Sequence, residues 1–148
     1  MKNMKRFLID TNIIVDYVLK REPFFTNSDF ILDSCANNII KGFIAYHSIP
    51  NLWYILRKYC STNERRKILL SICGFLTVIA SDHESVIAAI KNENINDFED
   101  ALQISCGNEA QVDYIVTRNI GDFSESDIAV ISPDIAVKKI KDLLSSQL

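Results

Sequence analysis

The stretch Arg6-Phe-Leu-Ile-Asp10 is a short apolar run that ends at a carboxylate. An apolar run of this length between polar residues predicts a buried β-strand. Thr11 or Asn12 can cap a helix directly after it, because apolar side chains recur at helical spacing through positions 13–18. The sequence therefore predicts a strand, then a helix, with an acidic side chain at the junction.

Short apolar runs and helical patterns alternate along the rest of the chain. Further strands are predicted at 42–45, 77–80, 114–117 and 129–131. The intervening helices are expected to begin near Thr26 to Ser28, Ser48, Thr62, Ser81 (with Glu84 in a capping box), Asn96 or Asp97, and Ser132. This alternation predicts an α/β fold, with a central parallel sheet of about four to five strands and helices on both faces. We expect one domain over residues 1–148, with ligands at the carboxyl ends of the strands.

The composition restricts the class of protein. The chain has 148 residues, of which 48% are hydrophobic and 24% charged, with 4 Gly and 3 Pro. These values are typical of a folded globular domain and argue against disorder. No apolar run approaches the roughly 20 residues that span a bilayer, and the first ten residues lack a signal-peptide pattern. We therefore expect a cytoplasmic protein without membrane association.

The cysteines and histidines argue against a zinc site. None of Cys35, Cys60, Cys73 and Cys106 stands in a C-x-x-C pair, and the two histidines lie far apart in the sequence. Each cysteine lies in an apolar or helical stretch, so we expect four buried free thiols.

The net charge bears on the kind of partner. It is −3, whereas proteins that bind nucleic acid are usually basic, so the charge counts against that class. An acidic metal site lowers the total by itself, however, and a nuclease remains compatible with this value.

Three carboxylates are candidates for such a site. Asp10 ends the first predicted strand, Asp122 follows the strand at 114–117, and Asp100 lies in the first turn of a helix. Mg²⁺ and Mn²⁺ prefer an oxygen-only site of this kind, and without a cation the three acids would repel one another. Each residue also has a structural interpretation: a helix cap for Asp10, a charge near a helix N-terminus for Asp100 and a turn for Asp122.

Three motifs resemble those of PIN domains, including the toxin nucleases of VapC type. Leu8-Ile-Asp-Thr-Asn12 is similar to their opening strand, and Asp97-Phe-Glu-Asp-Ala101 resembles their acid-bearing helix start. Ile115-Val-Thr-Arg-Asn-Ile-Gly-Asp-Phe123 is similar to their Thr-x-Asn-x-x-Asp-Phe loop. Any one motif is weak, but the three occur in family order across nearly the whole chain.

The resemblance implies an activity, a cofactor and partners. It implies a helix-flanked parallel sheet, hydrolysis of RNA, and Mg²⁺ or Mn²⁺ held by Asp10, Asp100 and Asp122. Thr117 and Asn119 match positions that support the site. It also suggests a homodimer and an antitoxin partner.

One position departs from the family pattern. Family members often carry Glu on the helix after the second strand, and the counterpart here is Asn51. An amide adds no negative charge, so the departure places a tightly bound second metal, and the level of activity, in doubt.

Other polar residues carry separate expectations. Arg118 shares the loop with Asn119 and is expected to contact a substrate phosphate. Asp97 is interpreted as a helix cap. Glu99 is compatible with two roles, a residue that supports the metal site or a side chain exposed to solvent. Asp16 is expected on a solvated helix face. The basic run at 65–67 is interpreted as a solvated face or an RNA-binding rim, and Trp53 and Tyr54 as packing or dimer contacts.

These observations favour a metal-dependent endoribonuclease that cleaves phosphodiester bonds with a metal-activated water, as the toxin of a toxin–antitoxin pair. A catalytically weak PIN-like module that binds RNA or a protein is the alternative. A phosphatase or receiver-type domain phosphorylated on Asp10 is disfavoured, because position 12 is not a second Asp and no Lys follows a late strand.

Overall fold

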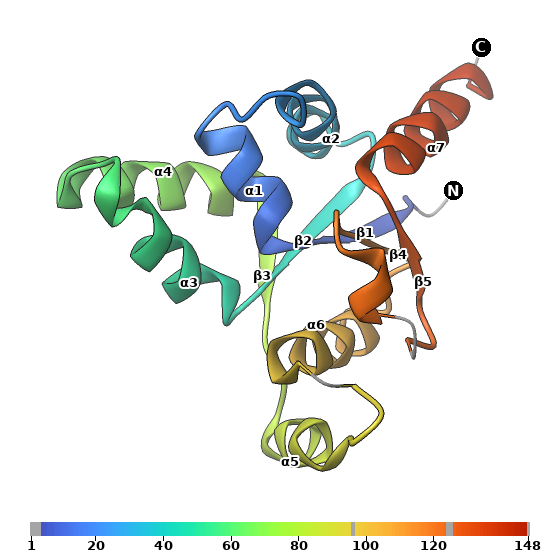
Figure 1. Ribbon diagram of the computed structural model, residues 1–148. Coiled ribbons are helices and arrows are strands. Elements are labelled where there is room, and N and C mark those ends of the chain that lie inside the picture. Colours follow the sequence, from blue (N-terminus) through green and yellow to red (C-terminus); the bar gives the residue numbers. More distant parts are fainter. Residues whose placement is uncertain (1–3, 96, 124–125, 148) are drawn as a thin grey trace.

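A central parallel sheet organises the molecule. The computed structural model describes residues 4–95, 97–123 and 126–147. Within these residues the sheet has five strands, all parallel, in the order β3-β2-β1-β4-β5 (Figure 1). The strands are β1 (Arg6–Ile9), β2 (Lys41–Ala45), β3 (Leu76–Ile79), β4 (Tyr114–Val116) and β5 (Ala129–Ile131). The predicted α/β class and strand number are confirmed.

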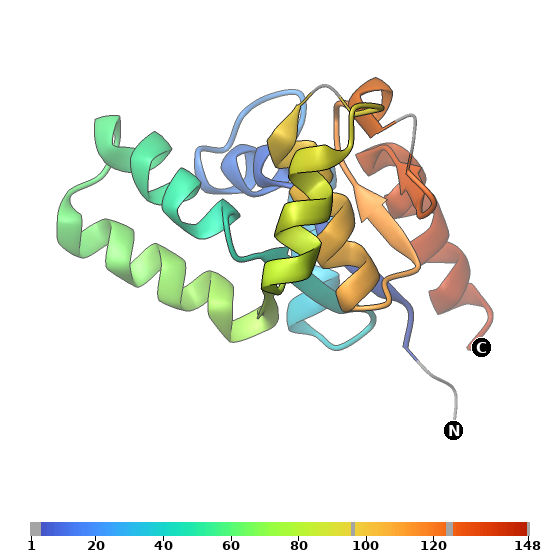
Figure 2. The same ribbon diagram turned by 90° about the horizontal axis from the view of Figure 1, so that it is seen from below.

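Helices cover both faces of this sheet. They are α1 (Thr11–Val18), α2 (Phe25–Ala36), α3 (Ser48–Ile55), α4 (Thr62–Phe75), α5 (His83–Lys91), α6 (Phe98–Glu109) and α7 (Pro133–Ser145), with short 3-10 turns η1 (Leu56–Lys58) and η2 (Ile120–Phe123). Helices α1, α2 and α7 lie on one face, and α5 and α6 lie on the other (Figures 1 and 2). The α3–α4 hairpin extends away from the sheet on the side of β3 (Figures 1 and 2).

Alternating side chains of the strands supply two separate cores. Phe7 and Ile9 of β1 pack with the helices α1, α2 and α7, whereas Leu8 between them packs with α5 and α6. Phe43 and Ile44 of β2 alternate in the same way. Strand side chains point to opposite faces with a period of two, so a strand buried on both faces reads as a continuous apolar run.

The helix caps differ in part from the predicted ones. Asp10, rather than Thr11 or Asn12, caps α1, and its side chain accepts a hydrogen bond from the Thr11 amide. Ser61, rather than Thr62, caps α4 in a capping box.

The predicted capping box of α5 is also wrong. Asp82 caps this helix by accepting from the Ser85 amide, so the helix begins one residue later than the Ser81 prediction requires. The caps Asp97 and Ser132 are confirmed, and Asn96 lies outside the described residues.

The strand order fixes where a ligand can bind. The chain runs outward from β1 through β2 to β3 and then crosses to the other side of β1, where it continues outward from β4 to β5. The direction of strand order therefore reverses between β1 and β4, which is the switch point. Clefts form there, beyond the carboxyl ends of the strands. The order also differs from the 2-1-3-4-5 order of receiver-type folds, which disfavours that alternative.

The cysteines follow the prediction only in part. All four are free thiols, but only Cys35 and Cys106 are buried, whereas Cys60 is half-buried and Cys73 is exposed. Cys60 lies in the loop between η1 and α4, and Cys73 lies on an outward-facing position of α4, which apolar neighbours in the sequence do not reveal. Over the described part of the chain, no helix has both the length and the apolar character needed to cross a membrane.

Candidate functional site

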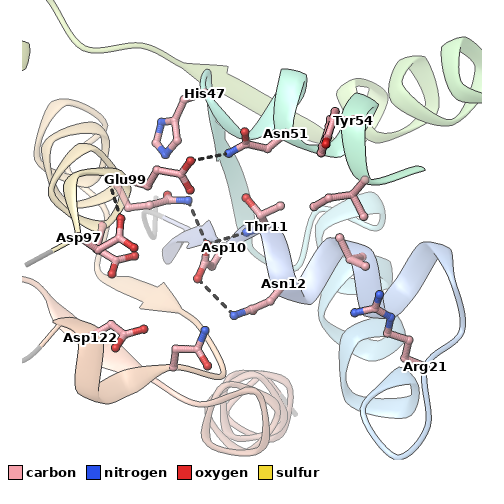
Figure 3. Close-up of a pocket in the computed structure, with 15 residues that line it drawn as sticks. Asp10, Thr11, Asn12, Arg21, His47, Asn51, Tyr54, Asp97, Glu99 and Asp122 are labelled. Atoms are coloured by element: carbon pink, nitrogen blue, oxygen red, sulfur yellow. Dashed lines mark hydrogen bonds between the residues drawn. The ribbon is translucent and has the colours of Figure 1, made fainter. Parts of the chain in front are cut away.

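A cavity of about 560 Å³ opens at the switch point between β1 and β4. It collects side chains that the sequence spreads over more than a hundred positions, and Figure 3 shows them as sticks. The predicted site residues that line it are Asp10, Asn51, Asp97, Glu99, Asp100, Asn119 and Asp122. The three resemblance motifs therefore meet in one place.

The Asp10 carboxylate is held by hydrogen bonds on both oxygens. Oδ1 accepts from the Thr11 amide at 2.7 Å and from Gln103 Nε2 at 3.1 Å. Oδ2 accepts from Thr117 Oγ1 at 2.7 Å and, over 3.4 Å, from Asn12 Nδ2. Burial raises the pKa of Asp10, and the bonds from Thr117 and Thr11 oppose that rise. The carboxylate thus has a fixed orientation at the floor of the cavity.

Thr117 lies behind this carboxylate and does not line the cavity. It is fully buried, and its Oγ1 accepts from the Asn119 amide at 3.0 Å while donating to Asp10. One hydroxyl therefore ties the end of β4 to the end of β1, which is an orienting role for Thr117.

Asp100 lies among other carboxylates. Its pKa is raised to about 7, first by burial and then by the negative charges of Asp97, Asp10, Asp122 and Glu99. The folded chain therefore concentrates negative charge at this point, which is the situation that a bound cation relieves.

Asn51 lies on the helix that follows the second strand, as the resemblance implied. It lines the cavity from α3, and its Nδ2 donates to Glu99 Oε1 at 3.5 Å across the gap to α6 (Figure 3). Asp97 has two roles, since it lines the cavity and its Oδ1 accepts from the Glu99 amide at 2.8 Å as the cap of α6.

The prediction for Asp16 is wrong. Its side chain is fully buried, and Arg118 Nε donates to Asp16 Oδ2 at 2.7 Å. The Arg118 guanidinium also lies 4.0 Å from the centre of the Phe24 ring and is not among the groups that line the cavity. Its expected contact with a substrate phosphate stays a prediction, and the structure gives it a different role in joining α1 to the loop after β4.

Several cavity residues were missed. Gln103 is one helical turn after Asp100 on α6, a spacing that could have revealed it. His47 follows β2 and could have been found by the strand-end rule. Burial lowers the pKa of His47, while the charges of Glu99 and Asp10 act to raise it. Arg21 also lines the cavity, and no motif indicated it.

The aromatic and basic residues of the α3–α4 hairpin pack on one another. Arg65 lies 4.1 Å from the centre of the Trp53 ring and donates to the Trp53 carbonyl at 2.9 Å. Arg57 lies 3.6 Å from the centre of the Tyr54 ring, and Tyr54 reaches the cavity rim. Part of the basic run is thus engaged in packing.

The donor set fits a hard divalent cation by its chemistry. The acidic groups offer oxygen ligands only, as Mg²⁺ and Mn²⁺ prefer, and the orienting bonds on Asp10 resemble the support that ligating carboxylates receive. Across residues 4–95, 97–123 and 126–147, no three His, Cys, Asp or Glu side chains are already arranged to hold an ion. The acids share a cavity but would have to draw closer on binding.

Comparison with known proteins gives a family and a set of similar folds. A model of the PIN domain matches residues 6–121. No curated protein matches the chain. Among solved structures, VapBC2 from Rickettsia felis, bound to a promoter DNA fragment, has a TM-score of 0.64 at 18% identity, covering 86% of this chain and 98% of that chain.

Two further structures are similar to the same extent. A toxin–antitoxin complex from Klebsiella pneumoniae has a TM-score of 0.64 at 19% identity, covering 85% of this chain and 96% of that chain. FitAcB from Neisseria gonorrhoeae has a TM-score of 0.63 at 16% identity, covering 86% and 97%. At such identities the likeness establishes the fold, and the match of the PIN-domain model over residues 6–121 identifies this chain as a member of the PIN-domain family.

Proposed function

We propose that this PIN domain is an endoribonuclease that depends on Mg²⁺ or Mn²⁺ and acts as the toxin of a toxin–antitoxin pair in the cytoplasm. The observation that carries the proposal is the meeting of Asp10, Asp100 and Asp122 in one cavity, each from a different motif. PIN domains are generally nucleases, and the solved toxin–antitoxin structures share this fold.

The charge around Asp100 supports a role for metal. Its pKa of about 7 reflects burial and four neighbouring carboxylates, an arrangement that would cost stability if it served only to build the fold. A purely structural cap or turn does not require such a concentration of acids.

The residues have separate roles in the proposed reaction. Asp10, Asp100 and Asp122 would hold the cation, which when bound supplies an activated water and neutralises charge on the phosphate. Thr117 and Gln103 hold the Asp10 carboxylate in one orientation through hydrogen bonds of 2.7 and 3.1 Å. Orientation of this kind reduces the reorganisation that the site must undergo during the reaction.

The proposed activity is tested by cleavage of a mixed RNA pool with and without Mn²⁺. The parent protein is expected to cleave only with the metal and to leave 5′-phosphate ends, and Asp10→Asn is expected to be inactive. A DNA pool tested in parallel distinguishes RNA from general nuclease activity. RNA left intact by the parent at millimolar Mn²⁺ would contradict the proposal.

A catalytically weak module that binds RNA or protein is a second candidate. Two observations favour it: Asn51 is neutral, and no three of the described His, Cys, Asp or Glu side chains are pre-arranged for an ion. RNA retained on a filter by both the parent and Asp10→Asn, with no cleavage by either, would support this candidate instead.

The proposed partners follow from the similar folds. The solved neighbours include toxin–antitoxin complexes, so we expect an antitoxin encoded beside this gene and a homodimer of the toxin. Inspection of the neighbouring reading frame and light scattering of the purified protein test these two expectations. A lone gene and a monomeric mass would contradict them.

A further inference from the structure

We propose that Glu99 supplies the acidic ligand that position 51 lacks, so that the fourth acid of the metal site comes from α6 instead of α3. The inference rests on the proposed metal-dependent function and specifies its ligand set. It concerns two side chains that face each other across the cavity, Asn51 from α3 and Glu99 from the first turn of α6 (Figure 3).

In the contact between the two residues, Asn51 is the hydrogen-bond donor and Glu99 is the acceptor. Asn51 Nδ2 donates to Glu99 Oε1 at 3.5 Å, so the amide draws the carboxylate towards the α3 side of the cavity. A Glu at position 51 would repel the same carboxylate. The neutral residue at 51 and the acid at 99 therefore form a compatible pair, and either position can carry the charge.

The Glu99 side chain lines the same cavity as the ligand candidates Asp10, Asp100 and Asp122. Its negative charge also acts to raise the pKa of Asp10 and of Asp100. His47 also faces it and is held towards its neutral form by burial. Among the described residues, the structure contains one ion pair, between Asp16 and Arg118. Glu99 therefore has no Lys or Arg partner among those residues.

A second observation points to a ligand beside these acids. Gln103 is 2% exposed and lines the same cavity. Its Nε2 donates to Asp10, and this bond fixes which end of the amide faces the carboxylate. Its Oε1 is buried and has no hydrogen-bond partner among the described residues. A buried carbonyl oxygen without a partner calls for a donor or a cation, and this one belongs to a side chain that lines the cavity.

Asp97 is less suited to the role of fourth acid. Its Oδ1 accepts from the Glu99 amide at 2.8 Å as the cap of α6, so movement towards an ion would release a helix end. Glu99 has a longer side chain. In the described structure its carboxylate accepts a side-chain hydrogen bond from Asn51 alone and caps no helix.

The test exchanges the charge between the two positions in the full-length protein. Mn²⁺ is titrated by calorimetry into the parent, Glu99→Gln, Asn51→Glu and the double variant Asn51→Glu/Glu99→Gln. Glu109→Gln is the matched control, because it removes the same charge from the other end of α6. Urea unfolding of every variant without metal verifies that each is folded.

The expected order of affinities is specific. Glu99→Gln should bind Mn²⁺ about tenfold more weakly, as for one lost charge–charge contact. The double variant should return to within about twofold of the parent, because it moves the acid across the contact and keeps the number of acids; residues in contact are expected to couple in this way. Asn51→Glu alone should gain less than about threefold, since the fourth acid is already present, and Glu109→Gln should bind as the parent does.

Other outcomes overturn the inference in distinguishable ways. If the parent binds Mn²⁺ and Glu99→Gln binds it equally well, Glu99 is not a ligand, while the proposed function stands. A double variant as weak as Glu99→Gln would mean that positions 51 and 99 do not reach the same ion. If the parent and Asp10→Asn both fail to bind Mn²⁺, the proposed function fails and the inference with it.

Discussion

Asp16 and Arg118 form an ion pair in which the carboxylate is completely buried and the guanidinium is not. Arg118 Nε lies 2.7 Å from Asp16 Oδ2, and the exposed side-chain fractions are 26% for Arg118 and 0% for Asp16. The pair joins α1 to the residue between Thr117 and Asn119, and so fixes the loop that carries Asn119 and Asp122 to the cavity.

This asymmetry predicts that the two halves of the pair differ in their effect on stability. Arg118→Leu leaves a buried carboxylate without a partner, which should cost about 3–5 kcal/mol of unfolding free energy. Asp16→Asn leaves a guanidinium that can reach water, so its cost should be smaller, about 1–3 kcal/mol. Urea denaturation measures both values, and equal losses would contradict the structural role assigned to the buried carboxylate.

Asp10→Asn should separate the site from the fold. Asn is as good a helix cap as Asp, so the variant keeps the cap of α1. It removes a charge that burial disfavours, but it replaces Oδ2, the acceptor for Thr117, by an NH2 group, while the remaining oxygen can still accept from Gln103. The unfolding free energy should therefore change by less than about 1 kcal/mol, while metal-dependent cleavage is abolished.

Thermal unfolding with and without Mn²⁺ measures both effects. Mn²⁺ should raise the melting temperature of the parent and leave that of Asp10→Asn unchanged, because only the parent binds the ion. A variant that is unfolded, instead of folded and inactive, would mean that Asp10 is chiefly a structural cap.

The local pattern was sufficient to predict the main features of the fold and the acids of the cavity. The apolar runs around Phe7 and Ile115 indicate buried parallel strands, and each is followed by polar residues at its carboxyl end. Parallel strands bring their carboxyl ends to the same edge of a sheet, which is why Asp10 and Asp122 could be placed together from the sequence.

At the site and its supporting contacts, the errors concern residues far apart in the chain. Asp16 is a charged residue in a helix, a type that is usually solvated, and its partner Arg118 is 102 positions away, so no local pattern reveals the ion pair that buries it. Gln103 is a neutral residue within a helix, and its bond to Asp10 spans 93 positions. Local spacing indicates periodicity, whereas a buried polar contact depends on which elements pack together.

The contribution of Asp100 to the stability of the metal-free protein should fall as the pH rises from about 4 to about 7. The pKa of Asp100 is about 7 in the folded protein against an ordinary 3.8, chiefly because of burial. Between these values the folded protein holds a proton that the unfolded chain has released, so raising the pH lowers the unfolding free energy. Above about pH 7 both states are ionised and this contribution becomes constant.

The comparison of Asp100→Asn with the parent isolates this contribution. His47 acts in the opposite direction, since its pKa is lowered by burial and the unfolded chain binds its proton more readily below about pH 6.5. The difference in unfolding free energy between variant and parent, measured by urea denaturation from about pH 5 to about pH 8, cancels the His47 effect. Identical pH profiles for the two proteins would contradict the clustering of acids around Asp100.

Gln103→Met tests whether the buried amide orients Asp10 or only fills space. Methionine has a similar length but cannot donate to Asp10 Oδ1, now 3.1 Å from Nε2, or to Ser48 Oγ, 3.3 Å away. It also removes the buried Oε1, which has no partner among the described residues. The lost bonds and the removed unpartnered oxygen offset each other, so the unfolding free energy should change by less than about 1 kcal/mol.

Residues that orient a metal ligand typically contribute 10- to 100-fold in affinity, so Mn²⁺ should bind about tenfold more weakly to the Gln103→Met variant. Calorimetry with Mn²⁺ and urea unfolding of the metal-free protein give the two values. A stable variant with the affinity of the parent would show that Thr11 and Thr117 alone are enough to orient the carboxylate.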